Sequence, residues 1–106
     1  MTQEASTESQ YALQARIEAK PDKVTEVREF LEAALSMAEK EEGTTTWFSY
    51  QIDETSFGIF DTFADEDGRQ AHLDGDIAAE LMDRADELLA EEPQIDEVDV
   101  LAAKHA

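Results

Sequence analysis

Apolar and polar residues alternate one by one over Tyr11–Glu18, which is the pattern of a strand with one buried face. Beyond Pro21 the apolar positions recur at a spacing of three and four residues, from Val24 to Ala38, and this predicts an amphipathic helix. Proline is suited to the start of a helix, and Gly43 is placed to end this segment. The first part of the chain therefore predicts a strand followed by a helix.

Two aromatic-rich segments follow, on either side of a turn predicted at Asp53–Ser56. The first opens after Gly43 and carries Trp47 and Tyr50; the second is Phe57–Phe63. Together they predict an antiparallel hairpin. Because strand side chains alternate between faces, Trp47 and Tyr50 point to opposite sides of the sheet. Both faces of the hairpin therefore carry large apolar groups.

The last part of the chain predicts two helical pieces and a final strand. Asp65 can cap a short helix that ends at Leu73, and Gly75 interrupts the helical pattern. A second helix is predicted over Asp76–Glu91 and a strand over Ile95–Ala102. The resulting order, strand, helix, strand, strand, helix, strand, predicts an α+β domain of the ferredoxin-like βαββαβ type.

We assign residues 11–102 to this single domain, with a flexible N-terminal tail over 1–10 and a C-terminal tail over 103–106. In such a fold the helices cover one face of the sheet and leave the other open. Aromatic side chains on the open face would form an exposed apolar patch, which a second copy packed sheet to sheet would cover. We therefore expect a homodimer, that is, a dimeric α/β barrel.

Composition excludes several classes of function. The chain has 106 residues and no cysteine, so disulfides and thiolate nucleophiles are excluded. Its net charge of −19 repels phosphate backbones and anionic lipids, so neither nucleic acid nor a membrane is expected as a partner. The N-terminus has neither the basic start nor the apolar segment of a signal peptide, and the cytoplasm is the expected compartment.

The acidic residues are dispersed along the whole chain, with 27 Asp and Glu against 8 Lys and Arg. A tail of acid would indicate an interaction segment, whereas dispersed acid favours a halophilic surface whose self-repulsion is screened by cations. The alternative is an ordinary acidic protein that its charge keeps in solution.

Thermal stability is expected to rise between millimolar and molar salt. The Debye length falls from roughly 10 Å at 0.1 M to about 3 Å at 1 M, so most of the repulsion between like charges is screened over this range. Melting curves in sodium chloride and potassium chloride measure the effect. A melting temperature that stays flat or falls would contradict the halophilic interpretation.

Several short motifs resemble the antibiotic biosynthesis monooxygenase superfamily, over roughly Tyr11 to Ala102. Lys20-Pro21 precedes the first helix, and Glu42-Gly43-Thr44 opens the second strand. Trp47 lies four residues after the glycine, where the family usually has Tyr. The segment FGIFDTFADEDGRQAHL then resembles the family pattern of an acid, an aromatic residue, a short helix and a histidine, here Asp61, Phe63 and His72.

The resemblance implies oxygenation of a small electron-rich aromatic, such as a quinol or polyketide phenol, without a cofactor. In that reaction the deprotonated substrate supplies the electrons, and the protein supplies a pocket, a base and groups that stabilise the anion. His72 would be the catalytic base, with Asp61 orienting it. The expected substrate-binding residues are Trp47, Tyr50, Phe63 and Arg16.

The chain departs from the family where Asp61 replaces the common Glu and Phe63 replaces the common Trp. Haem-degrading relatives need an Asn on the first strand as well as that Trp, and this chain has Gln14 or Arg16 there, so haem degradation is not implied. The alternative function is a non-catalytic dimeric module of the same fold that binds a small ligand or serves in stress.

Each candidate residue also has a structural interpretation. His72 could be a surface histidine bonded to nearby acid, and Asp61 could form a salt bridge with Arg16, Arg69 or His72. Trp47 and Tyr50 could be core and interface residues. No metal site is expected, because carboxylates near His72 are common in so acidic a chain.

Overall fold

The computed structural model describes residues 11–104. Its elements are β1 (Tyr11–Glu18), the single 3₁₀ turn η1 (Pro21–Lys23), α2 (Val24–Glu39), β2 (Thr44–Gln51), β3 (Ser56–Phe63), α3 (Glu66–Leu73), α4 (Asp76–Leu88) and β4 (Gln94–Asp99). This is the predicted βαββαβ order, with the second helix broken into α3 and α4. The tail predicted over residues 1–10 lies outside the described residues.

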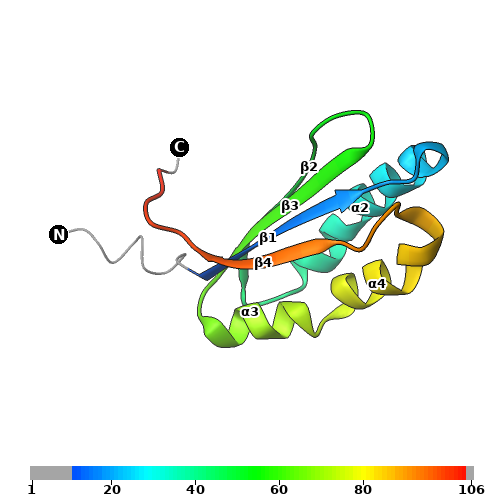
Figure 1. Cartoon of the computed structure of the whole chain (residues 1–106). Helices are drawn as coiled ribbons and strands as arrows, with labels where there is room; N and C mark the ends of the chain where they lie inside the picture. The colour runs from blue at the N-terminus through cyan, green and yellow to red at the C-terminus, as the bar shows by residue number, and fades with distance from the viewer. Residues whose placement is uncertain (1–10, 105–106) are drawn as a thin grey trace.

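The four strands form one antiparallel sheet in the order β2-β3-β1-β4. Figure 1 shows α2, α3 and α4 on the same side of this sheet, so the other face is open. The predicted ferredoxin-like α+β fold is confirmed. Among residues 11–104, no helix has the length and apolar character needed to cross a membrane.

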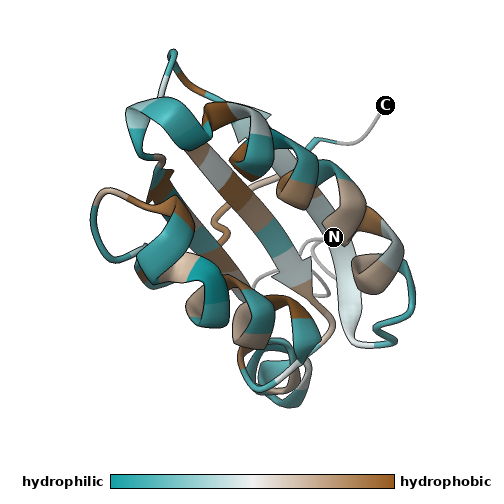
Figure 2. Cartoon of the chain, turned by 90° about the vertical axis from the view of Figure 1, so that its right-hand side faces the viewer, coloured by the Kyte–Doolittle hydropathy of each residue, from teal (hydrophilic) through white to brown (hydrophobic). Residues whose placement is uncertain are grey.

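The core lies between the sheet and the helices. Figure 2 looks from the helix side onto the sheet, where hydrophobic and hydrophilic residues follow one another along the strand seen between the helices. Ile17, Phe57 and Leu88 are almost fully buried there. Each such side chain contributes roughly 1.5–3 kcal/mol by its removal from water. The strand alternation predicted for Tyr11–Glu18 is therefore the alternation between core and open face.

Helix α4 ends three residues before the predicted end at Glu91. Leu89 is already extended, with φ −109° and ψ 142°, and it forms an isolated antiparallel bridge with Ala19. The backbone N–H of Lys20 also donates to the carbonyl of Leu88, 2.9 Å away. This pairing with the end of β1 overrides the helical pattern in the sequence.

The last strand ends at Asp99 rather than at the predicted Ala102. Asp99 pairs with Tyr11, the first described residue of its neighbour β1. On β4 the acidic positions Glu97 and Asp99 face the helix layer, where the buried guanidinium of Arg69 lies 3.6 Å and 4.0 Å from their carboxylates. Glu97 and Asp99 are therefore both paired with one arginine of α3.

Two glycines allow the start of α3 to approach the turn before β2. A Cβ on Gly43 would lie 2.8 Å from the Cα of Gly68, closer than real side chains allow. The carbonyl of Gly43 also accepts a hydrogen bond from the N–H of Ala64 at 3.0 Å. This close approach positions the turn that contains Glu41 beside α3.

The open face of the sheet carries an aromatic patch made of Phe48, Tyr50 and Phe60. Phe48 pairs with Phe60 across β2 and β3, and Tyr50 pairs with Gly58. The Tyr50 ring lies over Gly58, where a Cβ would be 2.4 Å from the ring. Phe48 is 57% exposed and Tyr50 43%. In the single chain this face therefore exposes large apolar side chains, as predicted.

Candidate active site

Asp61 and His72 meet between the sheet and the helices. Asp61 lies on β3 on the face that carries Phe57 and Ile59, and its side chain is 1% exposed. His72 lies in the last turn of α3 and is 7% exposed. Its Nε2 is 3.0 Å from Oδ2 of Asp61. The sequence left Arg16, Arg69 and His72 as possible partners of Asp61, and in the structure the partner is His72.

The short helix that carries His72 is fixed at its start by the predicted cap. The Asp65 side chain accepts a hydrogen bond from the N–H of Gly68 at 2.8 Å. Such caps typically contribute about 1 kcal/mol. The capped helix holds the imidazole against the ring of Phe63, with 5.3 Å between the ring centroids.

The second ring nitrogen of His72 is bound by Glu41, a residue for which the sequence predicted no role. Nδ1 lies 2.7 Å from Oε1 of Glu41. The same oxygen accepts a hydrogen bond of 2.7 Å from the hydroxyl of Thr44. The imidazole is therefore placed between two carboxylates, one from β3 and one from the turn after α2.

These surroundings move the protonation equilibria of both buried groups. Burial would lower the pKa of His72, but its contacts with Asp61 and Glu41 outweigh this and raise the pKa above the ordinary 6.5. Burial raises the pKa of Asp61 above the ordinary 3.8, although the contact with His72 opposes the shift. The pair therefore holds a proton more strongly than either group would in water.

A small, mainly apolar cavity of about 30 Å³ adjoins the pair. Its walls come from β1, β3, α3, α4 and β4, and its lining includes Leu13, Ala15, Ile59, Asp61, His72, Ile77, Ala78, Leu81 and Ile95. A cavity of this size holds on the order of two water molecules. Ile95, on the edge strand, is 40% exposed, so the cavity lies close to the surface at β4.

One oxygen of Asp61 retains hydrogen-bonding capacity. Oδ2 is buried and makes no well-aligned hydrogen bond to any group in residues 11–104, even though Nε2 of His72 is 3.0 Å away. Buried polar atoms without a partner are uncommon in folded proteins. Because Asp61 also lines the cavity, a ligand hydroxyl there would find an acceptor.

Trp47 lies on the same face of the sheet as Asp61, directly across from it on β2. It is half-buried and packs against Ala34, Ala38 and Ile77. Its indole N–H has no hydrogen-bond partner within the described part of the chain. Trp47 lines a groove between α2 and β2 rather than the cavity itself.

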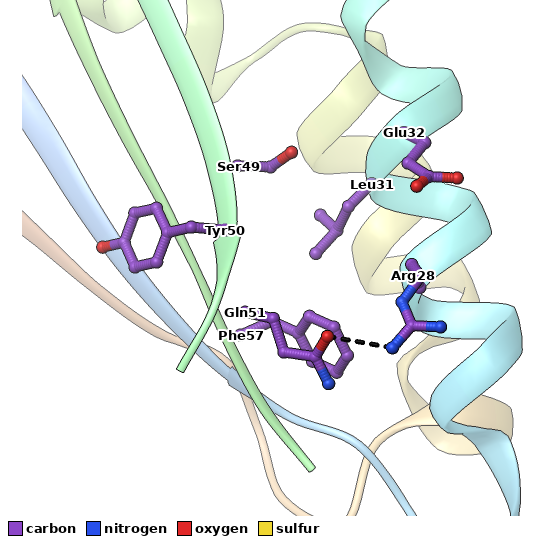
Figure 3. Close-up of a pocket in the computed structure, with 7 residues that line it drawn as sticks. All are labelled: Arg28, Leu31, Glu32, Ser49, Tyr50, Gln51 and Phe57. Atoms are coloured by element: carbon purple, nitrogen blue, oxygen red, sulfur yellow. Dashed lines mark hydrogen bonds between the residues drawn. The ribbon is translucent and has the colours of Figure 1, made fainter. Parts of the chain in front are cut away.

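The structure does not bring Tyr50 and Arg16 to this site. Arg16 pairs with Gly58, as Tyr50 does, so both belong to the open face of the sheet. Figure 3 shows the Tyr50 ring pointing away from α2, while Ser49 points toward it. The groove in that view has a volume of about 190 Å³, and a 2.9 Å hydrogen bond from Arg28 on α2 to Gln51 on β2 joins two of the residues that line it. Alternation along the strand separates these two residues from His72.

No group of three or more metal-ligating side chains with suitable geometry is present in residues 11–104.

Glu41, which holds Nδ1 of His72, could have been suspected from the sequence only because it lies two residues before Gly43, within the turn motif. With 27 acidic residues in the chain, charge alone gives no reason to select it.

Comparison with protein-family models and with curated proteins finds no match. Among solved structures, NE2512 of Nitrosomonas europaea, a protein of unknown function, is 48% identical, with a TM-score of 0.90. The alignment covers 94% of this chain and 97% of that one.

More distant structures share the fold. One, named "Putative antibiotic biosynthesis monooxygenase" from Nitrosomonas europaea, is 18% identical with a TM-score of 0.77, over 88% of this chain and 91% of that one. Another with the same description, from Caulobacter crescentus, is 16% identical with a TM-score of 0.75, over 94% and 97%.

Proposed function

Since the chain belongs to the same family as NE2512, within the antibiotic biosynthesis monooxygenase superfamily, we propose that it is a cofactor-independent monooxygenase of a small electron-rich aromatic. A quinol or polyketide phenol is the substrate class that the site suits. Such a substrate offers a hydroxyl to a proton acceptor and an apolar ring to the surrounding wall.

The observation that carries this proposal is the buried Asp61–His72 pair beside an apolar cavity. A histidine that served only at the surface would be solvated, whereas His72 is 7% exposed and lines the cavity. Oδ2 of Asp61, which lies 3.0 Å from Nε2 of His72 without a well-aligned hydrogen bond, supplies the acceptor for a substrate hydroxyl. Perturbed titratable groups in an enclosed site are typical of catalytic centres, although ion-pair networks produce them too.

The proposed reaction balances without an external reductant. Asp61 and His72 take the hydroxyl proton of a quinol, and the resulting anion transfers electrons to O₂ and forms a carbon–oxygen bond. Cleavage of the O–O bond then releases water, so that quinol plus O₂ gives hydroxyquinone plus water.

Substrate entry requires the cavity to widen. About 30 Å³ holds water but not an aromatic ring, and pockets for small ligands are typically roughly 300–1,000 Å³. The cavity wall includes half-buried Ala78 on α4 and partly exposed Ile95 on β4. We place the entrance between these two elements.

Oxygen consumption tests the proposal. Wild-type protein in molar potassium chloride is expected to consume O₂ with at least one member of a panel of quinols and anthrone-like phenols. His72→Gln should lower turnover by roughly 10²–10⁴-fold with a smaller effect on KM, since general acid–base assistance acts on the chemical step. Tyr50→Phe, on the opposite face of the sheet, is the control and should leave turnover unchanged.

The alternative is a non-catalytic dimeric module that binds a small ligand. Two observations favour it: both nitrogens of His72 are already held by carboxylates, and the cavity is small. No oxygen uptake by a folded wild-type protein across the panel would support this alternative. A folded His72→Gln variant with full turnover would remove His72 from the mechanism.

We also propose that the protein is a homodimer whose copies pack through the open sheet face. The aromatic patch of Phe48, Tyr50 and Phe60 provides the apolar surface for such an interface. Obligate interfaces of this kind typically bury more than about 2,000 Å² in total.

A further inference from the structure

Glu41 lies between the buried His72 and a groove on the surface. Its side chain is 22% exposed, while its Oε1 is 2.7 Å from Nδ1 of His72. The groove has a volume of about 290 Å³ and is lined by Met37, Lys40, Glu41, Ala71, Gly75 and Asp76. We infer that Glu41 is the solvent-side end of a proton path that leads from the cavity through Asp61 and His72.

The two nitrogens of the His72 ring face opposite ends of this proton path. Nε2 faces Asp61, which lines the inner cavity, and Nδ1 faces Glu41, which lines the outer groove. An imidazole can accept a proton at one nitrogen and release another from the opposite nitrogen. Asp61, His72 and Glu41 thus form a continuous chain from the cavity to solvent.

The inference rests on the proposed function and specifies where the substrate proton goes. The hydroxyl proton passes to the Asp61 carboxylate and then to Nε2 of neutral His72. The Nδ1 proton passes at the same time to Oε1 of Glu41, and from there to water in the groove. Asp61 is again a carboxylate, His72 is again neutral, and the substrate remains as its anion.

The surroundings hold Glu41 in the geometry that transfer requires. The hydroxyl of Thr44 donates to Oε1, the oxygen that also meets His72. Gly75 lies beside the second oxygen at the groove, since a Cβ there would be 3.4 Å from Oε2, an ordinary van der Waals contact. The other charged side chains lining this groove are the exposed Lys40 and Asp76.

Proton exchange between the His72 ring and water tests the path without any substrate. In ¹⁵N-histidine-labelled protein, Glu41→Gln is expected to slow exchange of the Nδ1 proton by at least about tenfold, because an amide cannot take the proton and the buried ring must then open to water. It should also lower the pKa of His72, since one carboxylate partner is lost. Glu42→Gln removes the same charge from the exposed neighbouring residue and should change neither value.

With a quinol that the wild type turns over, Glu41→Gln should also lower kcat by up to roughly 10²-fold while KM stays near its wild-type value. Unchanged exchange in Glu41→Gln would overturn the inference, even if oxygen uptake is observed in the wild type. A lower His72 pKa with unchanged exchange would show that Glu41 is only a structural partner. Slowed exchange in a wild type that consumes no oxygen would retain the path and reject the proposed function.

Discussion

His72→Ala is expected to lower the free energy of unfolding by about 3–5 kcal/mol at pH 8, because it leaves the Asp61 carboxylate buried without its partner. Asp61 is 1% exposed, so water cannot replace the imidazole without a local rearrangement. Chemical denaturation measures the loss. The double variant Asp61→Asn/His72→Ala should recover part of it, since it removes the unpaired charge.

The His72→Ala variant should itself be more stable at pH 5 than at pH 8. Burial already raises the pKa of Asp61 in the presence of His72, and removal of the imidazole removes the contact that opposes this shift. A carboxyl whose pKa is higher in the folded chain stabilises the fold fully below its unfolded pKa, and this contribution is lost as the pH rises through the folded pKa. A cost below about 1 kcal/mol at both pH values would contradict a buried, coupled pair.

Phe48→Glu is expected to weaken the proposed homodimer by at least about 2 kcal/mol, or roughly 30-fold in Kd. Phe48 is 57% exposed in the single chain and lies directly across from Phe60 on the open face. A carboxylate at the centre of an apolar interface would be buried without a partner. Light scattering coupled to size exclusion, over a range of protein concentrations, measures the change.

Met82→Glu is the matched control for this experiment. Met82 is 53% exposed on α4, on the helix side of the sheet, and the substitution introduces the same charge. It should leave the dimer intact. A folded wild-type monomer at micromolar concentration in molar salt would contradict the dimer, and dissociation by Met82→Glu alone would place the interface on the helices.

The order of elements could be predicted from the sequence because two signals agreed. The spacing of the apolar residues indicated the type of each element, and the capping and turn residues indicated where it starts and ends. The Asp65 cap is formed as expected, through a hydrogen bond to the N–H of Gly68. The end of α4 could not be predicted, since it depends on the pairing of Leu89 with Ala19, which lies far away in the chain. The local sequence pattern predicts a helix correctly only as far as its backbone hydrogen bonds stay within the helix. At the end of α4 the backbone instead bonds to a segment that is distant in the sequence.

The candidate site could be predicted only in part, because some of its contacts join segments that are distant in the sequence. Alternation required Trp47 and Tyr50 to be on opposite faces, but only the helix layer determines which face holds the cavity. Arg16 alternates with the core positions of β1 and so faces away from His72. Glu41 could not be identified, because its contact with His72 depends on the close approach of Gly43 to Gly68.

The proposed function requires a small phenol to bind beside His72, and nuclear magnetic resonance measures this binding most directly. Titration of phenol into the wild type should produce saturable shifts in the His72 ring and in the methyl groups of Ile77 and Leu81, which line the cavity. Ala78→Leu should abolish these shifts, since the larger side chain fills the cavity while Asp61 and His72 themselves are retained. Saturable shifts confined to Phe48 and Tyr50, or no saturable shift at all, would contradict binding of the phenol beside His72.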